Sequence, residues 1–146
     1  MQMKLPAFKM TDQNGNIITE EALKGKRTIL YFYPRDNTPT CTTQAVDFTN
    51  HLEELRQQGI QVYGVNGDSM KKHQNFIAKH DIGFDLLVDE DYKLAKELDI
   101  YKMKKVFGKE SMGIVRTTLL VGQDLQIEKR IDNVKVKNQL TELLDK

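Results

Sequence analysis

The sequence predicts an α/β fold with a mixed central sheet flanked by helices. Residues 28–33 form an apolar run without polar alternation, which is typical of a strand covered on both faces. Over residues 39–58 the apolar spacing changes to three and four residues, as on one face of a helix. A second apolar run follows at residues 60–65. Because the strands of such a strand–helix–strand unit pair in parallel, these segments indicate the parallel part of the sheet.

A β-hairpin is predicted at the N-terminus. Two short strand-like segments, residues 7–11 and 16–19, flank the turn at residues 12–15. Asn14 and Gly15 both tolerate positive φ, so this pair is a strong hairpin signal.

Strands and helices continue to alternate beyond residue 65. Asp68 or Ser69 is expected to cap a helix that ends near His80. Residues 101–107, with their lysines, are interpreted as a solvated loop rather than a segment facing a substrate opening. The remaining expected elements are a strand at 84–88, a short helix at 92–98, strands at 113–121 and 125–131 around a tight turn, and a helix at about 135–144.

Composition excludes several classes of function. A chain of 146 residues fits a single domain, 1–146. Lys plus Arg (22) nearly balances Asp plus Glu (21), and the two signs are mixed, so no nucleic-acid partner is expected. No apolar run approaches the roughly 20 residues of a membrane span, and residues 1–8 lack the apolar core of a secretory signal. With one cysteine, which fits a reducing compartment, we expect a cytoplasmic protein without membrane partners.

That cysteine, Cys41, lies where α/β sheets place their sites. Residues 34–41 connect the C-terminal end of a buried strand to the start of a helix. Thr38 followed by Pro39 is typical of an N-cap residue and a proline at the first helical position. Cys41 then lies in the first turn, among N–H groups that have no helical partner and stabilise an anion. For cysteine the anion is the reactive thiolate, although a lone cysteine is also common as a small buried apolar residue.

Arg116 is the second candidate. On an uninterrupted strand at residues 113–121, Arg116 shares one face with Ile114, Thr118 and Leu120. A guanidinium among apolar neighbours needs an anionic or hydrogen-bonding partner. The residues alone leave open a strand-end position in which Arg116 pairs with Glu110.

Pro34, Thr38 and Cys41 together reproduce the Pro-x-x-x-Thr-x-x-Cys signature of peroxiredoxins. Residues 31–34 and 38–42 resemble the bacterioferritin-comigratory (PrxQ) subfamily, and the similarity extends over nearly the whole chain. The resemblance implies a thioredoxin-like fold and a monomeric thiol-dependent peroxidase that reduces hydrogen peroxide and organic hydroperoxides through a sulfenic acid at Cys41. It also implies that Arg116 lies beside Cys41 and that Pro34 packs over the site. The Thr38 hydroxyl, the Cys41 backbone N–H and Arg116 are the expected donors to the reacting atoms.

The sequence departs from its relatives at the resolving cysteine. Many PrxQ proteins hold a second cysteine five residues after the first, and here that position is Val46. Regeneration must therefore use an external thiol: thioredoxin, a glutaredoxin or a small thiol such as glutathione. Two further departures are Thr40 in place of Gly and Gln44 in place of a frequent Glu.

Two other functions are weighed against a peroxidase. In a peroxide sensor a partner would read the oxidation of Cys41, and in a thioredoxin-fold binding protein Cys41 would be structural. We expect no metal and no cofactor, because His51, His73 and His80 lack ligand spacing. All three are interpreted as surface or half-buried residues.

Overall fold

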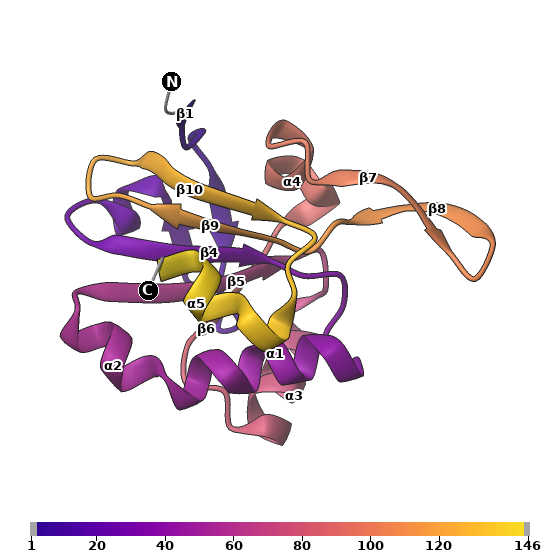
Figure 1. The fold of residues 1–146 in the computed structure, drawn as a ribbon, viewed down its shortest axis with the longest axis horizontal. Coiled ribbons are helices and arrows are strands. Elements are labelled where there is room, and N and C mark those ends of the chain that lie inside the picture. Colours follow the sequence, from indigo (N-terminus) through magenta and orange to yellow (C-terminus); the bar gives the residue numbers. More distant parts are fainter. Residues whose placement is uncertain (1–2, 145–146) are drawn as a thin grey trace.

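A mixed eight-stranded sheet forms the centre of the molecule in the computed structural model, which describes residues 3–144 (Figure 1). The strand order is β1-β10-β9-β4-β5-β6-β2-β3. In chain order these strands are β1 (Met3–Lys4), β2 (Lys9–Thr11), β3 (Ile17–Thr19), β4 (Arg27–Phe32), β5 (Ile60–Asn66), β6 (Asp85–Val88), β9 (Thr117–Val121) and β10 (Gln126–Asp132). Strands β4, β5 and β6 are parallel, and β9 runs antiparallel beside β4. The predicted mixed sheet is confirmed.

Helices cover both faces of this sheet. The helices are α1 (Pro39–Asn50), α2 (Leu52–Gln57), α3 (Met70–His80), α4 (Lys93–Glu97) and α5 (Gln139–Leu144), with 3₁₀ turns at Glu20–Leu23, Glu90–Tyr92 and Val136–Asn138. Ile29 and Tyr31 of β4 pack with side chains of α1, α2, α3 and α5 on one face. Leu30 and Phe32 pack on the other face with α4 and the N-terminal segment. Burial on both faces explains why β4 reads as a continuous apolar run.

The N-terminal hairpin and the capping of α3 follow the sequence pattern. Strand β2 pairs antiparallel with β3, and Gly15 in the turn has φ +83°. The Asp12 carboxylate accepts from the backbone N–H groups of Asn14 and Asn16 and so closes the turn. Ser69 is the N-cap of α3, and its hydroxyl accepts from the Lys72 backbone N–H at 3.2 Å.

The single helix expected over residues 39–58 is divided in two. Helix α1 ends at Asn50, and α2 begins at Leu52 after His51, whose φ and ψ are −106° and 7°. Near this break the Thr49 hydroxyl donates to the Ala45 carbonyl, and the His51 ring contacts the Asp47 carbonyl. Side chains that bond to helix carbonyls in this way bend helices.

The interpretation of residues 101–107 as a solvated loop is wrong. Strands β7 (Tyr101–Val106) and β8 (Lys109–Ile114) form a two-stranded antiparallel ribbon that projects from the body of the molecule (Figure 1). Its turn places Phe107 at φ +52° and Gly108 at φ +80°. The strand expected at 113–121 is also divided, because β8 ends before Val115 and β9 begins after Arg116. In residues 3–144, no helix is both long and apolar enough to cross a membrane.

Candidate active site

Cys41 lies in the first turn of α1, directly after the C-terminal end of β4. Its side chain is 1% exposed. Thr38 is the N-cap with extended backbone (φ −93°, ψ 154°), and Pro39 follows at the start of the helix. The Thr42 N–H donates to the Thr38 carbonyl at 2.8 Å, which opens the helical ladder after Cys41. The first-turn N–H groups, including that of Cys41, are therefore available to an anion or a ligand.

Arg116 points at the sulfur of Cys41. Its Nη2 lies 3.4 Å from Cys41 Sγ, and its Nη1 donates to Gln44 Oε1 at 2.7 Å. Arg116 stands in the break between β8 and β9 and not on the continuous strand expected from the sequence. The Val134 N–H donates to the Arg116 carbonyl and fixes the backbone at the break. Pairing of Arg116 with Glu110 is not what the structure shows.

Gln44 and Gln139 fix the far side of the guanidinium. Both side chains are buried. Gln44 Nε2 donates to Gln139 Oε1 at 3.1 Å, so Gln44 presents its oxygen to Arg116. Gln139 Nε2 in turn donates to Asp47 Oδ2 at 2.8 Å. A run of polar contacts thus connects Cys41 to the first residue of α5. Gln44 is one of the positions at which the sequence departs from its relatives, whereas the part played by Gln139 was not predicted from the sequence.

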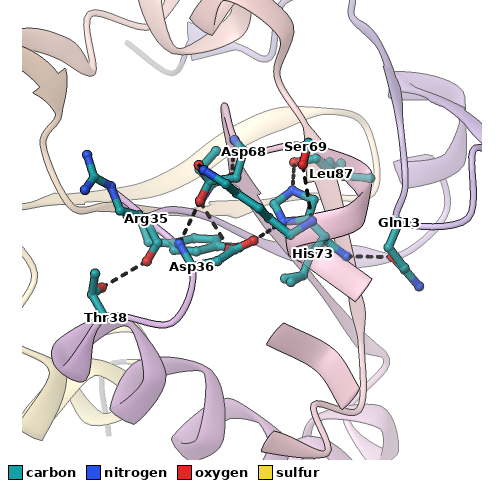
Figure 2. A network of polar contacts seen from close by, with 12 residues as sticks. Gln13, Arg35, Asp36, Thr38, Asp68, Ser69, His73 and Leu87 are labelled. Carbon is teal, nitrogen blue, oxygen red and sulfur yellow. Dashed lines mark hydrogen bonds and ion pairs between the residues drawn. The ribbon is translucent and has the colours of Figure 1, made fainter. Parts of the chain in front are cut away.

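Thr38 and Pro34 lie in the same loop as Cys41. The Thr38 hydroxyl donates to the Arg35 carbonyl at 2.9 Å and makes no side-chain cap (Figure 2). Pro34 is half-buried and lines an open pocket together with Arg116. The structure therefore brings the four predicted site residues to one region, and among the described residues Arg116 and Cys41 are joined by a side-chain hydrogen bond.

A buried acid–histidine pair anchors this loop. His73 Nδ1 lies 2.6 Å from Asp36 Oδ2, and His73 Nε2 lies 3.0 Å from the Leu87 carbonyl oxygen (Figure 2). Because a carbonyl can only accept, Nε2 donates to Leu87, and Nδ1 faces the Asp36 carboxyl group. The Tyr33 hydroxyl donates to Asp36 at 2.6 Å. The interpretation of His73 as a surface or half-buried residue is wrong, because its side chain is fully buried.

The backbone of the loop is held as well. The Asp36 N–H donates to Asp68 Oδ2 at 2.8 Å, and the Asn66 side chain contacts both carboxylates. Asn66 and Asp68 belong to the end of β5 and the turn that follows it. The loop between β4 and α1 is thus tied to the neighbouring strand through its backbone and through the Asp36 side chain.

Charged groups around the sulfur affect their neighbours. Burial lowers the pKa of Lys104, nearby Arg116 lowers it further, and the charge of Cys41 opposes both effects. Burial also raises the pKa of Tyr31 well above its usual range, with Cys41 and Asp36 adding to the rise. Lys104 and Tyr31 therefore both lie within electrostatic reach of Cys41.

Comparisons with known proteins identify the family. Residues 1–130 match the AhpC/TSA family. Peroxiredoxin Bcp of Bacillus subtilis is 42% identical over 141 residues, which cover 97% of this chain and 90% of the relative. The chain is a peroxiredoxin of the AhpC/TSA family.

Further relatives place this peroxiredoxin in the Bcp/PrxQ branch. Peroxiredoxin Bcp of Escherichia coli K12 is 34% identical over 133 residues, covering 91% of this chain and 85% of the relative. A solved structure of a cysteine-to-serine mutant of peroxiredoxin Q from Xanthomonas campestris is similar to this peroxiredoxin with a TM-score of 0.88 at 36% identity, covering 94% of this chain and 88% of the other. The thioredoxin-like fold and a thiol-dependent peroxidase activity, both implied by the sequence resemblance, are confirmed for this peroxiredoxin.

Proposed function

We propose that this peroxiredoxin reduces hydrogen peroxide and organic hydroperoxides with Cys41 as its nucleophile and without a second cysteine of its own. The observation that carries the proposal is the 3.4 Å contact between Arg116 Nη2 and Cys41 Sγ at the N-terminus of α1. A guanidinium and a helix N-terminus directed at one sulfur favour its thiolate, which is the nucleophilic form.

The first step forms a sulfur–oxygen bond. The Cys41 thiolate attacks one peroxide oxygen in line with the O–O bond, that bond breaks, and the departing oxygen takes a proton to leave as water or an alcohol. Cys41 becomes a sulfenic acid. Negative charge spreads from the sulfur to both oxygens in the transition state, so fixed donors at those atoms stabilise it more than the ground state.

Three donors serve this transition state in our proposal. Arg116 is held by Gln44 through Nη1 at 2.7 Å, which leaves Nη2 directed at the sulfur and the bound peroxide. The Cys41 backbone N–H is available because the helical ladder opens at Thr42. The Thr38 hydroxyl, which rests on the Arg35 carbonyl at 2.9 Å, rotates to meet the peroxide. Pro34 shields the sulfur from water.

An external thiol regenerates the enzyme. Cys41 is the only cysteine of the chain, and Val46 stands at the position where many relatives place a resolving cysteine. We propose that thioredoxin, a glutaredoxin or a small thiol reduces the sulfenic acid.

Organic hydroperoxides are included because of a solved relative. The bacterioferritin comigratory protein of Xanthomonas campestris, 35% identical with a TM-score of 0.88, is described by its alkyl peroxide reduction activity. The shared fold supports this class of substrate. We further propose a cytoplasmic, monomeric enzyme, for which light scattering of the purified protein tests the monomer.

Single-turnover peroxide consumption tests the function. Reduced protein is mixed with one equivalent of hydrogen peroxide, and Cys41 is followed by mass spectrometry with a sulfenic-acid trap, with Cys41→Ser as control. We expect one peroxide consumed per protein and a trapped sulfenic acid at Cys41. A rate equal to that of free cysteine would contradict the proposal. Repeated turnover with a thiol reductant then distinguishes a peroxidase from a sensor that reacts once.

A further inference from the structure

A cationic pocket of about 430 Å³ opens beside Arg116. Lys104 and Lys105 of the β7–β8 ribbon, Arg116 and Lys135 supply four positive side chains to its wall. None of the described residues that line it is acidic. The chain as a whole carries a net charge of only +1, so this concentration of positive charge is local.

The four cations are not neutralised by neighbouring carboxylates. None of them takes part in an ion pair within residues 3–144. Lys104 is half-buried and donates to the Ile114 carbonyl at 2.7 Å, which holds its ammonium group in the pocket wall. The pocket therefore carries unpaired positive charge that attracts an anion.

Apolar groups form the rest of the wall. Met103, Val115 and Val134 line it between the cations. Met103 is 58% exposed, so it is available for contact with a ligand. A bare inorganic ion makes no use of such groups, whereas a small organic anion contacts both kinds of surface.

We propose that this pocket receives a small thiol bearing a carboxylate, which reduces the oxidised Cys41. The inference rests on the proposed function, because it concerns the second half of that reaction. Arg116 lines the pocket and its Nη2 lies 3.4 Å from Cys41 Sγ, so this one side chain connects the pocket with the sulfur that the thiol must reach. Because the chain has no second cysteine, an external thiol has to reach Cys41.

The chemistry balances with two molecules of the thiol. The first thiolate attacks the Cys41 sulfur, the S–O bond breaks, and the hydroxide takes a proton to become water. A second thiolate attacks the small-molecule sulfur of the mixed disulfide and releases the Cys41 thiolate. Two thiols are oxidised to one disulfide, and the sulfenic acid is reduced.

The test compares one thiol with and without its carboxylates. Protein oxidised by one equivalent of hydrogen peroxide is mixed at low salt with glutathione or with glutathione diethyl ester, and sulfenic-acid reduction is timed. The variant Lys105→Gln/Lys135→Gln removes two exposed cations that have no part in the proposed catalytic machinery. For each thiol, the rate of sulfenic-acid reduction in the variant is divided by the rate in the wild type, and this ratio cancels the intrinsic reactivity of the thiol. Lys26→Gln, at the other end of β4, is the matched control.

In the double variant, we expect the rate constant for reduction of the sulfenic acid by glutathione to be roughly three- to tenfold lower than in the wild type. The rate constant with the diethyl ester should be nearly unchanged. Lys26→Gln should change neither. An equal effect on both thiols, or no effect on either, overturns the inference. The rate of Cys41 oxidation by hydrogen peroxide, measured on the same samples, should stay at the wild-type value. If no sulfenic acid forms even in the wild type, it is the proposed function that fails, and the inference falls with it.

Discussion

Gln139 sets the orientation of the Gln44 side-chain amide. Gln44 Nε2 donates to Gln139 Oε1 at 3.1 Å, and this leaves Gln44 Oε1 to accept from Arg116 at 2.7 Å. Arg116 is therefore held by a neutral acceptor, and its positive charge is not offset by a carboxylate on that side. A residue of the C-terminal helix thus positions the guanidinium that faces Cys41.

Replacement of Gln139 by Ala should slow the reaction with peroxide. Without the acceptor, the Gln44 amide is free to turn its NH₂ group toward Arg116, which displaces the guanidinium from the sulfur. We expect a roughly three- to tenfold lower second-order rate constant, and a loss of about 1–2 kcal/mol in the free energy of unfolding. Stopped-flow peroxide reduction and urea denaturation measure the two effects. Asn138→Ala, an exposed neighbour, should leave both unchanged.

Replacement of Arg116 by Ala should have the largest effect on chemistry. Loss of one preorganised donor to the transition state lowers rates about 10²–10³-fold in comparable enzymes. Arg116→Lys keeps the charge but not the two-pronged contact with Gln44 and Cys41, so its rate should lie between those of Ala and wild type. Arg35→Ala, at an exposed position in the loop between β4 and α1, is the control. A folded Arg116→Ala protein with the wild-type rate would exclude the proposed role.

Local patterns predicted the part of the fold that carries Cys41. The apolar run of β4, the Thr38–Pro39 pair and the helical spacing after it are consecutive in the chain, so the sequence shows them together. The ribbon escaped prediction because its turn places Phe107 at φ +52°, a conformation that bulky side chains seldom adopt. The break that positions Arg116 depends on a contact with distant Val134, which no local pattern shows.

Contacts between polar side chains far apart in the chain were also missed. Gln139 and Leu143 share one helix face, and both are buried. His73 and Phe76 do the same on α3, a spacing that could have indicated burial of His73. What the spacing does not indicate is the partner: Asp36 lies 37 residues before His73. Secondary-structure propensity and apolar periodicity indicate which face of a helix or strand is buried. They do not indicate which polar group from another segment contacts that face.

Asp89 should make stability depend on pH in the acidic range. Burial raises the pKa of this carboxyl above its usual value of 3.8, although it accepts from the N–H groups of Leu94 and Ala95. The native state therefore binds the proton more tightly than the unfolded state, and stability from this group falls as pH rises from about the unfolded value through the folded pKa. Asp89→Asn does not titrate. The free energy of unfolding of wild type minus that of Asp89→Asn should decrease from pH 3 toward neutrality, and a difference that rises with pH contradicts the prediction.

The Asp36–His73 pair should couple stability to the geometry of the Cys41 loop. Removing one partner of a buried pair leaves the other uncompensated and costs about 3–5 kcal/mol. His73→Leu leaves the Asp36 carboxylate with the Tyr33 and Asn66 donors only. We expect urea denaturation to show this decrease in the free energy of unfolding, and we expect Cys41 to react more slowly with peroxide. His80→Ala, half-buried on the same helix, should change both only slightly.

A double-mutant cycle separates the pair from simple packing. Asp36→Asn and Asp36→Asn/His73→Leu complete the set, and the double variant should be clearly less destabilised than the sum of the two single variants. Because the two side chains are buried and their polar atoms lie 2.6 Å apart, their coupling should exceed about 1 kcal/mol. Additive losses would mean that each residue stabilises the loop independently. The slowing of the peroxide reaction would then have to come from backbone contacts such as that between the Asp36 N–H and Asp68.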